Sequence, residues 1–204
     1  VRHGYPLMLD VTDRPIVIVG GGGVAVRKVA GLLAAGATRI RVVAPTFAED
    51  LSAAVERIEA TFEPKHLDGA GLVFAATSDS AVNAAVVAEC RRRGVLVNRT
   101  DGRDHPPGDF STPAVKREGP VTLTVATSGF PALAARIRDS LAVDIGLLAM
   151  AEAMQELRPT ILADRSLDPA ARRELFRRLA SDEAIAVLQE GGSLALKKWM
   201  RASE

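Results

Sequence analysis

Short β-branched runs alternate with helical patterns through the first half of the chain. Ile16 to Val19 is a continuous apolar tetrad between Pro15 and a run of glycines, which predicts a strand buried on both faces. The next segment, Val24 to Gly36, repeats its apolar residues at helical spacing and ends on a glycine, which predicts a capped helix. Strands that alternate with helices indicate βαβ units, so we expect an α/β fold built on a parallel sheet.

The same pattern predicts the other elements of this half. We expect further strands at Ile40 to Ala44, around Ala60 to Glu63, at Leu72 to Ala76 and at Val95 to Asn98. We expect helices near Ala48 to Arg57 and at Ser80 to Arg93. From Arg99 to Gly108, glycines and two consecutive prolines interrupt the pattern, which predicts a loop at the end of the last strand.

Most of the second half of the chain has a helical pattern. Val121 to Ala126 first alternates polar and apolar residues, as a half-solvated strand or an interface strand does. Helices are then predicted at Pro131 to Val143, where a proline starts the first turn, and at Pro169 to Ala180 behind Asp168, a favourable N-cap. Because residues 146–204 carry no strand pattern, we predict a separate helical domain there.

Composition narrows the classes of function. The 204 residues carry 26 Lys and Arg against 25 Asp and Glu, and 4% are aromatic, so we expect no nucleic-acid partner. Apolar runs such as Ile145 to Ala151 fall short of the roughly 20 residues of a spanning helix, so we expect no membrane partner. The single cysteine, Cys90, excludes an internal disulfide framework. No export signal opens the chain, so a cytoplasmic protein is expected.

The glycine run is the strongest chemical motif. Gly20, Gly21, Gly22, Gly23, Val24 and Ala25 fit the pattern G-x-G-x-x-A between a predicted strand and a predicted helix. In this pattern Gly20 permits the tight turn, Gly22 lets the backbone approach a pyrophosphate, and Ala25 lets the helix pack close to the sheet. The helix N-terminus then offers free N–H groups to the phosphates. We therefore expect a dinucleotide bound to a Rossmann-type sheet, although a plain glycine-rich turn is the alternative.

Two neighbouring turns bear on this cofactor. The second strand ends at Ala44 and Pro45 without the acidic residue that normally holds the ribose hydroxyls. The nearby Arg39 and Arg41 are weak indications of a pocket for a 2′-phosphate. Small residues before Thr77 end a later strand, where a nicotinamide ribose would approach the backbone. A plain turn with an N-cap at Asp79 or Ser80 explains the same residues equally well.

Several motifs in order along residues 5 to 145 carry a family resemblance. They are Tyr5-Pro-Leu-Met-Leu-Asp10, Val19-Gly-Gly-Gly-Gly-Val-Ala-Val-Arg-Lys28, Val42-Val-Ala-Pro45, Val73-Phe-Ala-Ala-Thr77 with Asn83, Val97-Asn98 with Asp101, Asp109-Phe-Ser-Thr-Pro-Ala114 and Pro131-Ala-Leu-Ala-Ala-Arg-Ile-Arg138. In this combination the chain resembles the precorrin-2 dehydrogenase family, which includes the dehydrogenase and ferrochelatase part of siroheme synthase.

The resemblance implies a function and a domain plan. It implies NAD-dependent oxidation of the tetrapyrrole precorrin-2 to sirohydrochlorin, and in some members insertion of ferrous iron as a second substrate. It implies a homodimer with a Rossmann domain at residues 1–113, a dimerisation segment at residues 114–145 and a helical domain at residues 146–204. Carried over, the cofactor site falls on the glycine turn with Ala44 and Pro45, and the catalytic aspartate falls on Asp101, although Asp104 is an alternative because the following loop is longer here.

Substrate contacts are less defined. Asn98, Arg103, Thr127, Ser128 and Arg136 are the predicted substrate-binding residues, and the turn that carries Thr127 and Ser128 is shorter than in the family. Precorrin-2 is rich in carboxylates, which arginine binds in bidentate pairs. The wider set of basic candidates is Arg99, Arg103, Lys116, Arg117, Arg136 and Arg138, of which most are expected to be solvated. His105 has no second ligand at a suitable spacing, so no resident metal site is expected.

Two other functions fit the glycine turn. A non-enzymatic sensor would bind NAD to control a partner, but it would leave the segment from Asp101 to Ala114 without a role. A reductase acting on a small substrate would need a catalytic pair such as Tyr and Lys, and the only tyrosine, Tyr5, precedes the first strand.

Overall fold

The computed structural model describes residues 4–101 and 108–202 of the chain. It divides into two compact units, Val1–Thr112 and Pro113–Glu204. Each unit has a sheet and its own buried apolar residues. The two units are therefore described separately.

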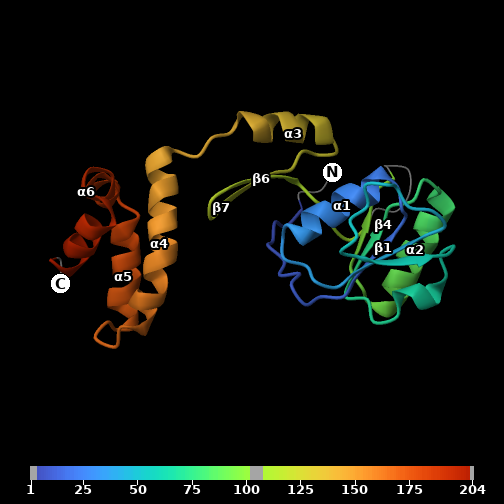
Figure 1. The fold of residues 1–204 in the computed structure, drawn as a ribbon, viewed down its shortest axis with the longest axis horizontal. Helices are drawn as coiled ribbons and strands as arrows, with labels where there is room; N and C mark the ends of the chain where they lie inside the picture. Colours follow the sequence, from blue (N-terminus) through green and yellow to red (C-terminus); the bar gives the residue numbers. More distant parts are fainter. Residues whose placement is uncertain (1–3, 102–107, 203–204) are drawn as a thin grey trace. The chain divides into compact units, whose positions relative to one another are not determined.

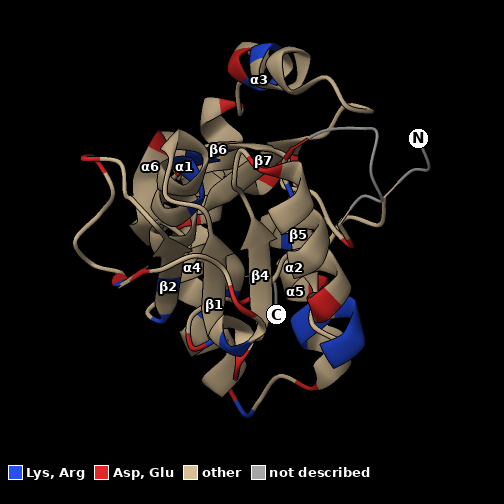
Figure 2. Cartoon of the chain, turned by 90° about the vertical axis from the view of Figure 1, so that its right-hand side faces the viewer, with Lys and Arg blue, Asp and Glu red and all other residues tan. Residues whose placement is uncertain are grey.

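A five-stranded parallel sheet forms the centre of the first unit (Figure 1). Its strands are β1 (Ile16–Val19), β2 (Ile40–Ala44), β3 (Glu56–Glu59), β4 (Leu72–Ala75) and β5 (Val97–Arg99), in the order β3-β2-β1-β4-β5. All four residues of β1 and of β4 are buried, because both strands lie inside the sheet and both of their faces are covered. Figure 2 shows these two strands free of charged residues.

Each face of this sheet packs against a helix. α1 (Gly23–Leu33) contributes Ala25 and Val29 to the cluster that contains Ile16 and Ile18. α2 (Ser80–Arg93) contributes Val86 and Cys90 to the cluster that contains Val17 and Val19, beside the short 3-10 helix η1 (Pro64–Leu67). Successive residues of β1 thus face opposite helices, which is the arrangement of a Rossmann-type fold.

The second unit combines a hairpin with helices. β6 (Ala114–Glu118) and β7 (Val121–Val125) pair antiparallel, and α3 (Pro131–Ser140) packs against both strands. α4 (Ile145–Ala163), α5 (Pro169–Leu179) and α6 (Asp182–Arg201) bury a shared core that includes Leu157, Leu179 and Leu196. In the described part of the chain, no helix is apolar over a length that would cross a bilayer. A division of this unit into a dimerisation segment and a helical domain stays a prediction.

The predicted fold class is confirmed, and the errors lie at the sheet edge. The strands at Ile16 to Val19 and Ile40 to Ala44 and the helix at Ser80 to Arg93 are confirmed with these bounds. The helix predicted near Ala48 to Arg57 is wrong, because this segment is a loop that leads into β3.

The strand predicted around Ala60 to Glu63 lies at Glu56–Glu59, four residues earlier. Strand β6 was not predicted. Strand β3 lies at the edge of the five-stranded sheet, and β6 belongs to the two-stranded sheet. Both strands are rich in charged residues, so they lack the apolar run that reveals a buried strand.

Candidate functional site

Four turns of the first unit lie at one edge of the sheet. Because the five strands are parallel, the turns that follow β1, β2, β4 and β5 all lie at the carboxyl edge. β1 lies between β2 and β4, and α1 and α2 leave this edge on opposite faces of the sheet. A sheet of this kind binds its ligand in the crevice at this switch point.

Glycine is required in the turn after β1 by close backbone contacts. Gly20 has a φ of 123°, and a Cβ atom there would collide with the carbonyl oxygen of Ala76. A Cβ atom on Gly21 would collide with the carbonyl oxygen of Thr46 and would lie 2.8 Å from the Cβ atom of Ala44. The turn therefore packs directly against the ends of β2 and β4. Gly20 and Gly21, both predicted cofactor residues, are needed for this close packing.

Gly22 and Gly23, by contrast, face open space. A Cβ atom on Gly22 would meet nothing within 4 Å, and one on Gly23 would meet only the end of the Arg27 side chain at 3.8 Å. Gly22 is the N-cap of α1, no side chain caps this helix, and its first turn carries no acidic residue. A helix N-terminus with free N–H groups and unobstructed approach suits a pyrophosphate, so this turn fits a dinucleotide.

The turn after β2 is tied to the glycine turn. The amide of Gly20 donates to the carbonyl of Val43 at 2.9 Å, and the amide of Ala48 donates to the carbonyl of Gly21 at 2.8 Å. Ala44 is buried and Pro45 is exposed at this point. A larger residue in place of Ala44 would displace the glycine turn, which gives this predicted cofactor residue a structural reason to be small.

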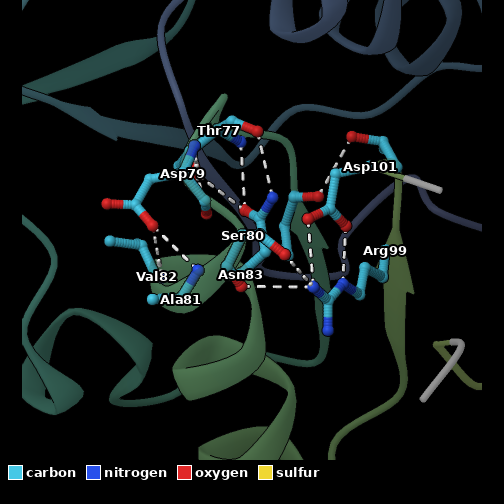
Figure 3. A network of polar contacts seen from close by, with 10 residues as sticks. Thr77, Asp79, Ser80, Ala81, Val82, Asn83, Arg99 and Asp101 are labelled. Carbon is cyan, nitrogen blue, oxygen red and sulfur yellow. Dashed lines mark hydrogen bonds and ion pairs between the residues drawn. The ribbon is translucent and has the colours of Figure 1, made fainter. Parts of the chain in front are cut away.

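The turn after β4 is fixed by its own polar side chains. Asn83 is buried, and its Oδ1 accepts from the amide and the hydroxyl of Thr77 at 3.1 and 2.8 Å. Asp79 caps α2 by accepting from the amides of Ala81 and Val82 at 2.8 and 3.2 Å (Figure 3). The N-cap interpretation of Asp79 is thus confirmed, and the contact of Thr77 with a cofactor stays a prediction.

The end of β5 is buried under a returning segment. The amide of Asp109 donates to the carbonyl of Val97 at 2.7 Å, and the amide of Val97 donates to Asp109 Oδ2 at 3.0 Å. Asn98 is buried, and its Nδ2 donates to the carbonyl of Phe110 at 2.7 Å. Its Oδ1 has no partner among the described residues. Asn98 therefore fixes this segment and keeps one acceptor free.

Asp101, the predicted catalytic residue, is held by Arg99. Arg99 Nε donates to Asp101 Oδ1 at 2.5 Å, and Arg99 Nη2 donates to Asp101 Oδ2 at 3.0 Å (Figure 3). The Arg99 side chain is 1% exposed and that of Asp101 is 14% exposed. The guanidinium holds the pKa of the Asp101 carboxyl well below its usual range, against the opposing effect of burial. The aspartate is therefore ionised and bound on both oxygens.

Asn98 lies at the end of β5 with Asp101, and the other predicted substrate residues lie outside the described residues or in the second unit. Arg103, the alternative carboxylate Asp104, and His105 lie outside the described residues. Thr127, Ser128 and Arg136 belong to the second unit, where the Thr127 hydroxyl donates to the carbonyl of Phe130 at 2.6 Å. Arg99, one of the basic candidates for the substrate, is occupied by Asp101.

Lys28 of α1 makes contacts that the sequence does not predict. Its Nζ donates to the hydroxyl of Thr112 at 2.5 Å and lies 5.8 Å from the centre of the Phe74 ring. Burial lowers the pKa of this amine, with a smaller effect of the neighbouring Arg27 charge. Lys28 ends the motif that contains the glycines, and this position was the only indication of a role in the sequence. The sequence did not show that the amine contacts Thr112.

Comparison with known proteins identifies the family. A family model described as "Putative NAD(P)-binding" matches residues 7–114, which include most of the first unit. Siroheme synthase from Chromobacterium violaceum is 34% identical to the chain over 204 residues, which cover 96% of this chain and 43% of that protein. Siroheme synthase 1 from Serratia proteamaculans is 41% identical over 142 residues, which cover 67% of this chain and 29% of that protein. The chain thus spans less than half the length of these relatives.

A solved structure has the same fold over nearly the whole chain. The structure titled "SirC, precorrin-2 dehydrogenase" has a TM-score of 0.76 and 24% identity, and the match covers 98% of this chain and 100% of that one. These similarities confirm the resemblance that the motifs indicated. The match of the family model to more than half of the chain, together with the open glycine turn, shows that the chain belongs to this NAD(P)-binding family.

Proposed function

We propose that this chain oxidises precorrin-2 to sirohydrochlorin with NAD, a step of siroheme biosynthesis. The observation that carries the proposal is the ionised carboxylate of Asp101 at the same sheet edge as the open glycine turn. Similarity to siroheme synthases over 96% of the chain supports it. A domain that only bound a nucleotide would need no ionised carboxylate at this edge of the sheet for its binding function.

The reaction removes one hydride and one proton from the tetrapyrrole. NAD, when bound, would supply the hydride acceptor for this reaction. The glycine turn and the N-terminus of α1 would hold its pyrophosphate. Asp101 presents a negative charge where the substrate becomes positive as the hydride leaves. In its present pairing Asp101 does not accept the proton, which passes to water unless the ion pair opens.

The structure supports NAD over NADP as the cofactor. Arg39 and Arg41, the two arginines near the second strand, both bind other groups of the protein. Arg41 Nε pairs with Glu56 Oε2 at 3.1 Å, and Arg39 Nη1 donates to the carbonyl of Asp13 at 3.4 Å. A 2′-phosphate would need a free basic group at the end of β2, where this chain has Ala44 and Pro45.

Most of the residues proposed to bind the substrate offer donors to its carboxylates. Lys28 of the first unit contributes an amine, and Arg103, Thr127, Ser128 and Arg136 keep the roles that the resemblance implies. Asn98, whose Nδ2 is bonded to the carbonyl of Phe110, contributes its Oδ1 acceptor. The proposal also includes a cytoplasmic homodimer that associates through residues 114–145. Ferrous iron enters only as a second substrate. In the described part of the chain, no group of three or more His, Cys, Asp and Glu residues is placed to hold a metal ion.

The test is an anaerobic assay without added metal. Purified protein is mixed with precorrin-2 and NAD, and the absorbance of NADH is followed. We expect NADH to form with the wild-type chain and with the control Asp68→Asn, which removes an exposed surface carboxylate that pairs with Arg93. We expect Asp101→Asn to lose most of this activity, and Asp104→Asn decides whether the alternative carboxylate contributes.

The outcome separates the enzyme from the sensor. A protein that binds NAD by titration but forms no NADH with precorrin-2 would exclude the dehydrogenase and favour the non-enzymatic sensor. Addition of ferrous iron to the product in the same cuvette then tests the chelatase activity, and sedimentation equilibrium tests the homodimer.

A further inference from the structure

The Arg99 guanidinium is one of the most completely buried charged groups in the described part of the chain. It lies at the end of β5 with 1% of its side chain exposed. A buried cation is costly unless its hydrogen bonds are satisfied by fixed partners. Arg99 meets this need on two sides, with Asp101 on one and the start of α2 on the other.

The contacts with α2 hold the guanidinium in place. Arg99 Nη2 donates to the carbonyl of Ser80 at 3.1 Å and is 3.0 Å from its hydroxyl oxygen. Ser80 is the first residue of α2, directly after the N-cap Asp79. The same turn is fixed by Asn83 and Thr77, whose side chains are hydrogen-bonded to each other (Figure 3). The guanidinium is therefore anchored to a turn that is itself rigid.

Two nitrogens of the Arg99 guanidinium donate to Asp101. Nε and Nη2 form the two parallel bonds of a fork, which fixes both the position and the plane of the carboxylate. The fork leaves Nη1 buried and without a partner among the described residues. A lysine could supply the charge but not this planar fork.

We propose that Arg99 is a positioning residue that fixes the Asp101 carboxylate, in its ionised form, at the cofactor edge of the sheet. Its role in catalysis rests on the proposed function, whereas the pairing itself does not. Asp101 then acts through the reaction as an oriented negative charge and does not titrate near neutral pH. Among the described residues, Arg99 is the charged group that acts on the pKa of this carboxyl, and Asn83 adds a hydrogen bond.

The first test follows the carboxyl group directly and needs no activity. The carboxyl carbon of Asp101 is observed by NMR in carbon-labelled protein between about pH 4 and pH 8, near and above the ordinary aspartate pKa of about 3.9. Its signal is assigned by its loss in Asp101→Asn. We expect no titration in the wild-type chain. In Arg99→Gln we expect titration to begin in this range, because burial then raises the pKa without opposition.

The second test follows the reaction. We expect Arg99→Gln to lower kcat roughly 10- to 100-fold through misplacement of the carboxylate, with the KM for NAD unchanged. We also expect a new loss of activity toward acid pH. Arg99→Lys keeps the charge without the fork, so it should restore the pH profile and only part of kcat. It also serves if Arg99→Gln fails to fold.

The matched control is Arg92→Gln, which removes an exposed arginine that pairs with Glu89 on α2. It should leave the Asp101 signal and kcat unchanged. Titration of Asp101 in the wild-type chain, or an Arg99→Lys variant equal to the wild type in kcat, would overturn the proposal. A wild-type chain without activity would overturn the proposed function, and the NMR titration would still decide the pairing.

Discussion

Gly22 differs from Gly20 and Gly21 in the reason for which glycine occupies the cofactor turn. Gly20 and Gly21 are required by the fold, because a side chain at either position would collide with neighbouring backbone. Gly22 has an ordinary φ of −87° and open space where its Cβ would lie. No neighbouring atom therefore requires a glycine at this position, and a substitution at Gly22 tests binding without disturbing the fold.

Gly22→Asp is predicted to weaken NAD binding while the fold remains stable. Aspartate is a favourable N-cap, so the free energy of unfolding should stay the same or rise by a few tenths of a kcal/mol. The new carboxylate repels the pyrophosphate and occupies its N–H groups, so the Kd for NAD should rise at least tenfold, about 1.4 kcal/mol. Calorimetric titration and urea unfolding measure the two effects.

The control for this variant lies further along the same helix. Gly31 sits in the interior of α1 with nothing within 4 Å of a Cβ atom. Gly31→Ala should raise the free energy of unfolding by about 0.5–1 kcal/mol and leave NAD affinity unchanged. Wild-type NAD affinity in Gly22→Asp would show that the pyrophosphate does not lie on this turn.

Cys90 is predicted to be inert in the folded protein. Its side chain is fully buried between α2 and the sheet, and burial raises the pKa of the thiol to about 11, with a further contribution from Asp109. Because only the thiolate reacts, a disulfide reagent at about pH 8 should modify Cys90 slowly in native protein and rapidly after unfolding. Complete modification within minutes under native conditions would contradict this placement.

Helix α2 carries a pH-dependent contribution to stability. Glu89 accepts from Arg92 at 2.6 and 2.8 Å and from Arg93 at 2.5 Å. These bonds, with that from Arg92 first, lower the pKa of the Glu89 carboxyl to about 2 from 4.5. Since the folded pKa lies below the unfolded one, the stabilisation is present above about pH 4.5 and is lost as the pH falls toward 2.

Glu89→Gln should therefore destabilise the protein at neutral pH and have little effect at low pH. Urea unfolding of both proteins between about pH 7 and pH 3 gives the difference in midpoint at each pH. The difference should shrink as the pH falls below about 4.5. A difference that stays constant with pH would show that the glutamate contributes through packing and not through its charge.

Elements with both faces buried were predictable from the sequence, and edge elements were not. β1 consists of Ile and Val only, so its apolar pattern allows one interpretation. β3 has only Ile58 packed against the core, so its polar neighbours concealed it. Leu51 and Val55 lie four residues apart and are both buried, which imitates one face of a helix although the segment is a loop.

The parts of the candidate site that depend on contiguous residues were predictable from the sequence. The glycine turn follows from a contiguous motif, because backbone contacts at Gly20 and Gly21 impose the residue type. The ion pair that holds Asp101 was not predicted, although Arg99 is only two residues away. Its formation depends on the side of the sheet to which Arg99 turns and on the position of Ser80, and both are set by packing.

The cofactor site described above lies entirely in the first unit, and none of its turns belongs to the second unit. Residues 7–114 match the NAD(P)-binding family, and all four turns of the site lie within them. The second unit carries its own core and the predicted substrate residues Thr127, Ser128 and Arg136. We therefore expect Arg136→Gln to raise the KM for precorrin-2 and to leave the Kd for NAD unchanged.

Transfer of a hydride from precorrin-2 to NAD by this chain would produce NADH and sirohydrochlorin together. The most direct measurement is the anaerobic stoichiometry of the wild-type protein, with NADH and sirohydrochlorin quantified by absorbance in the same cuvette. We predict one NADH for each sirohydrochlorin formed, and none when either precorrin-2 or NAD is omitted. Sirohydrochlorin without NADH, or no change in either with NAD demonstrably bound, would contradict hydride transfer to NAD.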